Sequence, residues 1–458
     1  MKSSEISLSQ ANPKSDSVVL LKLVFCSLLG VLFFLTPVKF DGNWTILLSI
    51  ISNFIIDMIG KNMAYFTLPI FIFGSLVSLV YFLVPRKINR KLPYAKYLTA
   101  SHWSWVLLST IGGVVPLMLL FGIGPEWVIG KDTGVTAYID VAGAIFCFIG
   151  LGCLFLPFLS DYGLLDFIGT LMRRPFKAIF NLPGRSTIDV LASWVGSTSI
   201  GVILTSLQYE KGYYSARESA TLVTSFSVVS LPFVILTCQV AGLPEYFFQV
   251  YGSMAFVCIL CAIIVPKLPP LSRIPDEYLP SAGKQLFEVA EEGHSTISWA
   301  KHRALEVVKA SPSPMQSLQH GFAKMLDIFI MMMPAAMTIE FIALSVYYYT
   351  PIFQTITYPL IPVLEFLNIP EATKAAPGLV IGLLDQFVPA IVAGEIESKV
   401  TRFVLTGLSV TQLIFFAETA LLIMRSKIPI SVPQLVAIFC IRTIIALPIL
   451  AGIAHWIF

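Results

Sequence analysis

Nine segments of this chain are each long and apolar enough to cross a bilayer, which takes about 20 apolar residues per helix. Hydrophobic residues make up 56% of the sequence and charged residues only 12%, whereas soluble domains carry roughly 25% charged residues. This composition indicates an integral membrane protein, and the small net charge of +3 gives no sign of nucleic-acid binding. We expect helices at 18–35, 65–84, 105–122, 141–159, 219–240, 248–265, 323–347, 403–424 and 435–458.

Lysine and arginine predict how the chain is oriented, because they favour the cytoplasmic side of short loops. Basic clusters at 86–96, 173–185 and 267–309 are expected inside, which places the N-terminus in the cytoplasm and the C-terminus outside, provided that segment 44–59 does not cross. The shorter apolar segment 44–59 contains Asp57 and is either a tenth span or an interfacial segment.

Two polar octads recur inside otherwise apolar spans. Thr-Ser-Phe-Ser-Val-Val-Ser-Leu at 224–231 resembles Thr-Gly-Leu-Ser-Val-Thr-Gln-Leu at 406–413, and each follows a polar, interrupted hairpin at 184–206 or 378–399. Irregular backbone inside a membrane is tolerated only where it is buried in protein or lines a wet cavity. Matched broken segments are the best sequence indication of a transporter's binding site.

The fold class that follows is an all-α membrane protein with two inverted repeats, because the charge-derived topology admits one hairpin from each side of the membrane. The predicted regions are a cytoplasmic tail at 1–17, N-terminal scaffold helices at 18–136, a first repeat at 137–265, a cytoplasmic amphipathic segment at 266–322 and a second repeat at 323–458. Each repeat contains one re-entrant hairpin, the layout associated with alternating access.

The candidate substrate-binding residues lie in the hairpins and octads. Their hydroxyl, amide and carboxylate groups suit a polar solute or a sodium ion, although hydroxyls can instead bond to their own helix or help helices to pack. The candidates are Ser197, Thr198, Ser199, Thr224, Ser227, Asp385, Gln386, Thr406, Ser409 and Gln412.

Three carboxylates are candidates for ion coupling: Asp189, Asp385 and Glu418. An unpaired charge in the membrane costs roughly 3 kcal/mol or more on insertion scales, so each must be paired, protonated or ion-bound. Arg442 is an alternative neutralising partner for Glu418, which would make that pair structural. For Asp327 and Glu340 it is likewise open whether the carboxylate has a structural partner or serves ion coupling.

Several short motifs resemble the YjiH family of bacterial inner-membrane proteins, which carry the nucleoside recognition or Gate domain. The resemblance extends from about residue 161 onward. It implies a core like that of the concentrative nucleoside transporters, with two inverted re-entrant hairpins, two unwound helices and sodium or proton coupling. The motifs are Gly-Arg-Ser-Thr-Ile-Asp at 184–189, Ser-Trp-Val-Gly-Ser at 193–197, Tyr-Ser-Ala-Arg-Glu at 214–218, Glu-Ser-Lys-Val-Thr-Arg-Phe at 397–403 and Leu-Ser-Val-Thr-Gln-Leu at 408–413.

The first hairpin departs from the transporter pattern. Nucleoside transporters carry a Gly-Gln-Thr-Glu type signature there, whereas this chain has Gly-Ser-Thr-Ser at 196–199. Only Gly196 and Thr198 carry over, and the amide and the acid are absent. The substrate class therefore stays open among nucleosides, nucleobases, amino acids and dipeptides.

We expect a secondary active transporter that moves a small polar organic solute and is coupled to Na⁺ or H⁺. No cofactor or metal is expected apart from Na⁺ as a candidate coupling ion, and the expected partners are the solute, membrane lipid and either a second copy or a smaller Gate-domain subunit. The alternative is a non-transporting Gate-domain subunit of a hetero-oligomeric complex. An enzyme is not expected, because the chain has no phosphate-binding loop, His-Glu-x-x-His or Gly-x-Ser-x-Gly motif.

Overall fold

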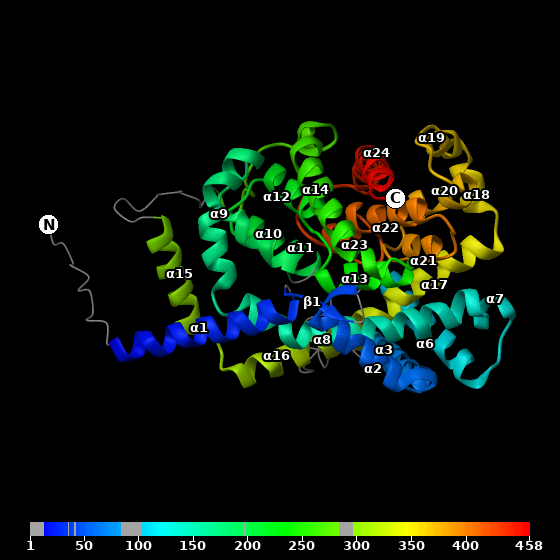
Figure 1. Ribbon diagram of the computed structural model, residues 1–458, viewed down its shortest axis with the longest axis horizontal. Helices are drawn as coiled ribbons and strands as arrows, with labels where there is room; N and C mark the ends of the chain where they lie inside the picture. The colour runs from blue at the N-terminus through cyan, green and yellow to red at the C-terminus, as the bar shows by residue number, and fades with distance from the viewer. Residues whose placement is uncertain (1–12, 35, 41–42, 84–102, 196–197, 284–295) are drawn as a thin grey trace.

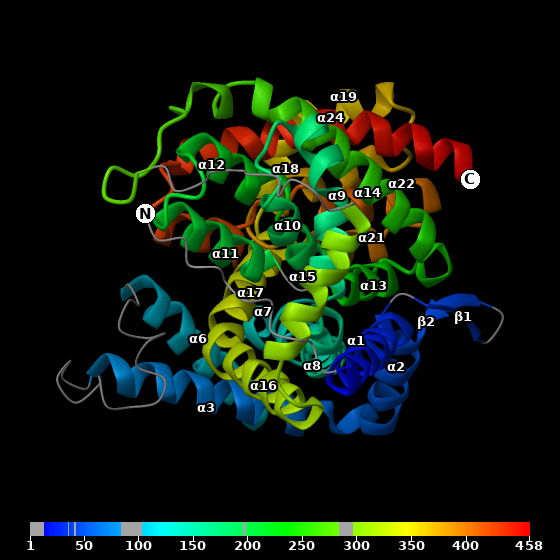
Figure 2. The ribbon, with the colours of Figure 1, turned by 90° about the vertical axis from the view of Figure 1, so that its left-hand side faces the viewer.

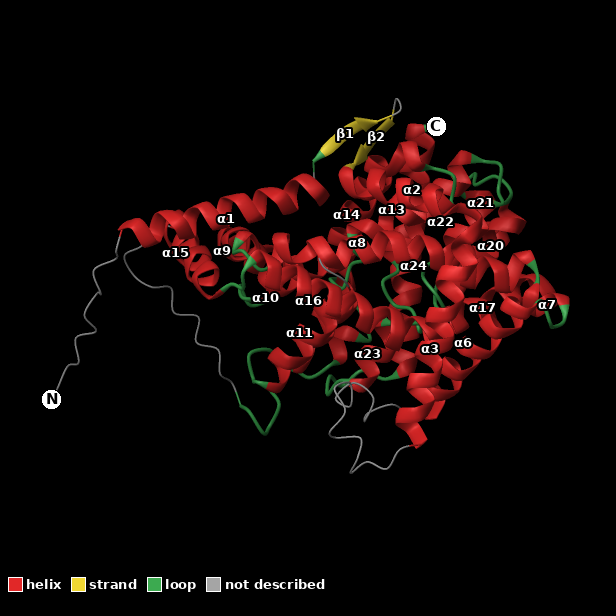
Figure 3. Cartoon of the chain, turned by 90° about the horizontal axis from the view of Figure 1, so that it is seen from below, coloured by secondary structure: helices red, strands yellow, loops and turns green. Residues whose placement is uncertain are grey.

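The computed structural model describes residues 13–34, 36–40, 43–83, 103–195, 198–283 and 296–458. This part of the chain is helical except for one antiparallel hairpin, formed by β1 (Pro37–Phe40) and β2 (Asn43–Ile46), which projects from an edge of the molecule (Figures 2 and 3). The expected all-α fold is confirmed. The basic cluster at 86–96, most of the 1–17 tail and Ser197 lie outside the described residues.

The first half of the chain builds a scaffold layer and then the first hairpin. Helices α1, α2, α3, α6 and α8 lie together on one side of the molecule, and α10 and α11 lie on the other (Figures 1 and 2). In chain order, the helical elements are α1 (Pro13–Phe34), α2 (Leu47–Ile59), η1 (Gly60–Asn62), α3 (Met63–Leu83), α6 (Trp103–Phe121), α7 (Glu126–Ile129), η2 (Lys131–Val141), α8 (Ala142–Ser160), α9 (Leu164–Phe180), α10 (Ser186–Val195) and α11 (Thr198–Glu210).

The rest of the chain, from residue 216 onward, contains both broken helices and the second hairpin. Helices α14, α22 and α24 gather on the side opposite the scaffold layer (Figure 1). The elements are α12 (Ala216–Ser225), α13 (Leu231–Val240), η3 (Pro244–Tyr246), α14 (Phe247–Ile264), η4 (Val265–Lys267), η5 (Leu271–Arg273), α15 (Thr296–Ala310), α16 (Pro314–Asp327), η6 (Ile328–Met332), α17 (Met333–Tyr349), α18 (Ile352–Thr357), η7 (Tyr358–Leu360), α19 (Ile361–Phe366), α20 (Ala372–Ile381), α21 (Val388–Gly394), α22 (Lys399–Thr411), α23 (Thr419–Arg425) and α24 (Val432–Ile457).

The helices are those of a multi-pass membrane protein. Within the described residues, 5 helices are long and apolar enough to cross a membrane, and shorter apolar helices accompany them. One of the 5 runs from Leu47 to Val80 over 34 residues. Segment 44–59 therefore supplies the end of β2 and then α2, which continues through η1 into α3.

Two helical hairpins and two interrupted helices appear where the octads predicted irregular structure. Helices α10 and α11 form the first hairpin, close to the expected 184–206, and α20 and α21 form the second. The second hairpin starts and ends earlier than the expected 378–399, and Pro389 lies in the first turn of its second helix, α21. Proline suits a first turn, where its missing N–H has no intrahelical partner. The inverted relation of the two repeats stays a prediction.

Close backbone contacts hold α6 against α17 and α3 against the preceding turn η6. A Cβ atom on Gly112 of α6 would lie 2.0 Å from the carbonyl oxygen of Pro334, and one on Gly74 of α3 would lie 2.3 Å from that of Ile330. Small residues at helix crossings allow this close approach in membrane proteins. The two glycines therefore set how near α6 comes to α17 and how near α3 comes to the π-helical turn η6.

We expect Gly112→Ala to lower the unfolding temperature of the purified protein, because the added methyl group overlaps a main-chain oxygen that cannot move aside. Overpacking of this kind costs about 1–3 kcal/mol. The matched control is Gly252→Ala in α14, where a Cβ atom would meet nothing within 4 Å. A thermal-unfolding series in detergent checks both variants, and equal unfolding temperatures for the two would contradict the packing argument.

Candidate functional site

The first helix break lies between α12 and α13. Pro232 has no N–H to donate to the carbonyl of Val228, so that oxygen is left without its helical partner. Hydroxyl groups of the first hairpin donate hydrogen bonds to this oxygen instead. Ser193 Oγ and Thr198 Oγ1 donate to the Val228 carbonyl oxygen at 3.4 and 3.5 Å. The first hairpin is therefore bonded to the first break.

The second break lies between α22 and α23 and is bonded to the tip of the second hairpin through main-chain groups. The N–H of Phe416 donates to the Leu383 oxygen at 2.8 Å, and the N–H of Ala417 donates to the Leu384 oxygen at 3.0 Å. Leu413, just after α22, has a φ of 61°, a left-handed conformation that is strained for a branched residue. The chain thus leaves the helix sharply and runs alongside the hairpin.

Two predicted site residues brace this second hairpin. Ser409 Oγ donates to the Gln386 carbonyl oxygen at 2.5 Å, and Gln412 Nε2 donates to the Leu379 oxygen at 2.9 Å. Gln412 Nε2 also donates to Thr443 Oγ1 at 2.8 Å. These side chains position the hairpin tip, since their donors are bound to protein oxygens.

A single buried arginine joins the two breaks. Arg442 of α24 is 0% exposed, and its Nε and Nη2 donate to the Thr411 oxygen at 3.0 and 2.7 Å. Its Nη1 donates to the Thr224 oxygen at 3.4 Å. Both oxygens lie in the last turn of an interrupted helix, where carbonyls have no intrahelical donor and the helix dipole attracts positive charge. Arg442 therefore caps both helices, which differs from the pairing with Glu418 that the sequence offered as an alternative.

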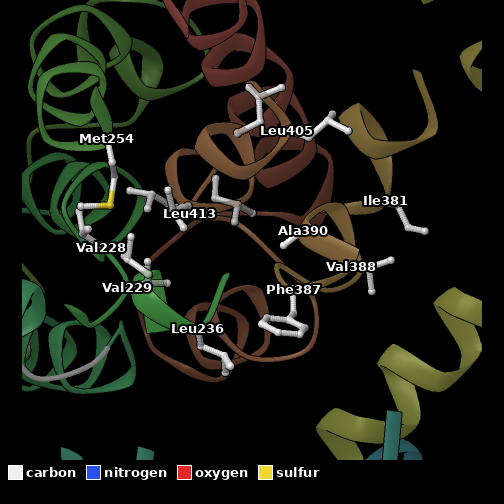
Figure 4. Close-up of a cluster of buried hydrophobic side chains, with 14 of the residues drawn as sticks. Val228, Val229, Leu236, Met254, Ile381, Phe387, Val388, Ala390, Leu405 and Leu413 are labelled. Atoms are coloured by element: carbon white, nitrogen blue, oxygen red, sulfur yellow. The ribbon is translucent and has the colours of Figure 1, made fainter. Parts of the chain in front are cut away.

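A cavity of about 130 Å³ lies where these elements meet. The second hairpin contributes Asp385, Gln386 and Phe387, the first break contributes Val229 and Ser230, and α8, η6 and α17 close the other side. Figure 4 shows Val228, Val229, Phe387 and Leu413, from the two breaks and the second hairpin, in one buried cluster. Most of the lining is apolar, so its few polar groups determine what the cavity can bind.

The carboxylates of the cavity lining differ in their hydrogen-bond and electrostatic partners. Asp385 Oδ1 accepts the N–H of Phe387 at 2.7 Å. Glu340 of α17 is 0% exposed, and neither of its oxygens has a hydrogen-bond partner among the described residues. Glu418 lines the cavity together with Lys324, and these two side chains interact electrostatically.

The side-chain amide of Gln386 is a further polar group at the cavity. Gln386 is 2% exposed, and both its Oε1 and its Nε2 lack a partner within the described part of the chain. A buried amide without partners is costly, because it has given up its hydrogen bonds to water. A ligand with both a donor and an acceptor would satisfy it.

The structure brings only some of the predicted site residues to the cavity. Thr198, Asp385, Gln386 and Glu418 line it. Asp189, in α10 of the first hairpin, instead accepts a hydrogen bond from the Tyr214 hydroxyl at 2.5 Å.

The remaining candidates serve the helices themselves or fall outside what can be described. Thr224 and Thr406 donate to carbonyls of their own helices, at Ala220 and Arg402, both at 2.7 Å. Ser227 is buried at the first break. Ser197 lies outside the described residues, as does the side chain of Ser199.

Lys324 is a cavity residue that sequence reasoning missed, and Glu340 was raised only as an open question beside Asp327. Both cavity residues lie in the expected span 323–347, where a charged side chain is itself an indication of function. What the sequence could not show is that α16 and α17 direct these two side chains to the same cavity as the second hairpin.

Comparison with known proteins places the chain in a family. The profile of the Gate family, described as nucleoside recognition, matches residues 142–244, a range that holds the first hairpin and the first broken helix. An uncharacterized protein of Alkalihalophilus pseudofirmus is 37% identical over 441 residues, which cover 96% of this chain and 95% of that protein. The chain belongs to this YjiH-like Gate family. No solved structure matches it.

Family membership and the helical architecture together indicate a transporter-like membrane protein. The family profile covers the first hairpin and break but ends before the second hairpin, Lys324 and Glu340. The cavity described above therefore combines a Gate-domain element with residues from the second half of the chain.

We expect Arg442→Met to lower the unfolding temperature sharply, because two buried helix-end carbonyls would lose their donor. Each unsatisfied buried group costs about 1–3 kcal/mol. Arg442→Lys should fall between wild type and Arg442→Met, since an ammonium group cannot reproduce the fork of the guanidinium. The control is Arg303→Met, whose pairing with Glu306 lies on the surface. Equal unfolding temperatures for Arg442→Met and Arg303→Met would contradict the capping role.

Proposed function

We propose that this protein is a secondary active transporter of a small organic solute, coupled to Na⁺ or H⁺, in a bacterial inner membrane with the N-terminus in the cytoplasm. The observation that carries the proposal is the cavity where the second hairpin tip and both helix breaks meet, with carboxylates in an apolar lining. Interrupted helices around a central site are the architecture of alternating-access carriers.

Coupling follows from the electrostatics of this cavity. A charged carboxylate in an apolar, water-poor cavity is unfavourable unless a cation or proton neutralises it. The empty, charged site therefore resists the conformational change that exposes it to the other side, whereas the loaded and neutralised site permits it. Asp385 and Glu418 are the coupling carboxylates in this scheme, because both line the cavity and interact electrostatically.

The solute would be held by the second hairpin and by the walls of the cavity. Gln386 offers a donor and an acceptor, and Phe233 and Phe387 present aromatic surface with ring centroids 5.7 Å apart. A solute with both polar and apolar parts fits this lining better than a uniformly polar one.

We expect Asp385→Asn and Glu418→Gln each to abolish gradient-driven uptake while leaving the protein folded in the membrane. The assay uses proteoliposomes with an imposed Na⁺ or proton gradient and radiolabelled uridine, uracil, leucine and alanyl-alanine as separate probes. Without the coupling charge, the ion gradient can no longer drive transport, so the variants should accumulate no solute above background.

Glu306→Gln is the control for this experiment, because it removes the same charge from an exposed side chain of α15. It should transport at the wild-type rate. Undiminished uptake by both cavity variants would contradict the coupling role. Failure of the folded wild-type protein to accumulate any of the four probes under either gradient would contradict the transport proposal for these solute classes.

A further inference from the structure

The cavity carries an excess of negative charge. Among the described residues that line it, the carboxylates are Glu340, Asp385 and Glu418, and the one basic side chain is Lys324. Lys324 interacts electrostatically with Glu418, and Glu340 and Asp385, two like charges, interact with each other. One basic side chain can offset at most one of the three carboxylates.

Glu340 is the group that most needs a ligand. Its side chain is fully buried, and both of its oxygens lack hydrogen-bond partners within the described residues. Asp385, by contrast, is supported by the N–H of Phe387. A buried carboxylate without donors is stable only when a positive charge or a proton meets it. The missing partner is therefore cationic or supplies a proton.

Two other features of the lining indicate that the partner is organic. Gln386 presents an unsatisfied buried amide, which pairs with a ligand amide or hydroxyl. Phe233 and Phe387 both line the cavity, and aromatic faces attract ammonium groups as well as apolar chains. A bare metal ion would bind to the carboxylates but would leave the amide without a hydrogen-bond partner and the aromatic rings without a contact.

We propose that the cavity binds a small organic cation, whose protonated amine lies between Glu340 and Asp385, whose apolar body packs on Phe233 and Phe387, and whose polar end bonds to Gln386. This assignment names the substrate class of the proposed transporter and rests on that function for its role in transport. Glu340 is thereby a binding residue of the site.

Leucinamide is a suitable probe, since it combines a protonated amine, an apolar chain and a carboxamide. Its matched neutral analogue is 4-methylpentanamide, which lacks only the amine. Binding to the full-length protein in detergent is followed by thermal shift and tryptophan fluorescence at about pH 6.5, below the pKa of about 8 of an α-amino group. Sodium chloride is titrated separately at constant ionic strength, to distinguish an organic cation from a coupling ion.

We expect leucinamide to bind at least about tenfold more tightly than 4-methylpentanamide, the equivalent of one charge-assisted hydrogen bond. Glu340→Gln should remove that difference while 4-methylpentanamide binds unchanged, which also shows that the variant is folded. Asp327→Asn, in α16 and outside the cavity lining, is the matched control and should behave as wild type.

A second variant tests the amide independently. Gln386→Met should weaken leucinamide but not 3-methylbutylammonium, which has the same amine and branched end and no carboxamide. Equal binding of leucinamide and 4-methylpentanamide would overturn the proposal. So would a stabilisation by sodium alone that depends on Glu340 while leucinamide has no effect.

These outcomes are separable from the fate of the transport proposal, because no gradient or membrane is needed for binding. If the protein binds leucinamide but moves no solute, the proposed cation site stands and the proposed carrier function fails. A protein that accumulates a neutral solute under a gradient and does not bind leucinamide retains the carrier function and loses the cation site.

Discussion

Interrupting a helix inside an apolar protein leaves carbonyl groups without donors, and the fold depends on the one side chain that supplies them at both interruptions. The guanidinium of Arg442 bonds to the Thr411 and Thr224 oxygens, so one charge stabilises the ends of α12 and α22 together. Because these helices belong to different halves of the chain, the same group also fixes their separation. The hairpin tips are then bonded to the breaks, and the cavity forms between them.

The sequence located the interruptions well, but it could not show which protein groups their polar residues bond to. The octad at 224–231 spans the first break, the octad at 406–413 covers the end of α22 and the start of the second break, and the resemblance to the Gate family is confirmed. Yet Thr224 and Thr406 bond to their own helices, and Ser409 and Gln412 brace the second hairpin. These bonds give the recurring polar residues a structural role at the two breaks, and their contact with a ligand stays a prediction.

The cavity itself could not be read from local pattern. Lys324, Glu340 and Asp385 come from α16, α17 and the second hairpin, and hydropathy assigns each only to an apolar segment. A lone carboxylate in a span signals function but not its neighbours. The bounds of the second hairpin show a related limit, since Pro389 can interrupt a helix or begin one. In the structure Pro389 lies in the first turn of α21.

The position of Arg442 also decides how the cavity acids behave. Had the guanidinium faced Glu418, as a sequence-level pairing of opposite charges suggests, the arginine would have neutralised part of the cavity permanently. Its donors instead serve main-chain oxygens at the helix ends, and Lys324 is the basic residue of the described lining. The cavity thus keeps more acids than bases in an apolar surrounding. A site of that kind is neutralised only by what enters it, and this dependence is what a coupled carrier requires.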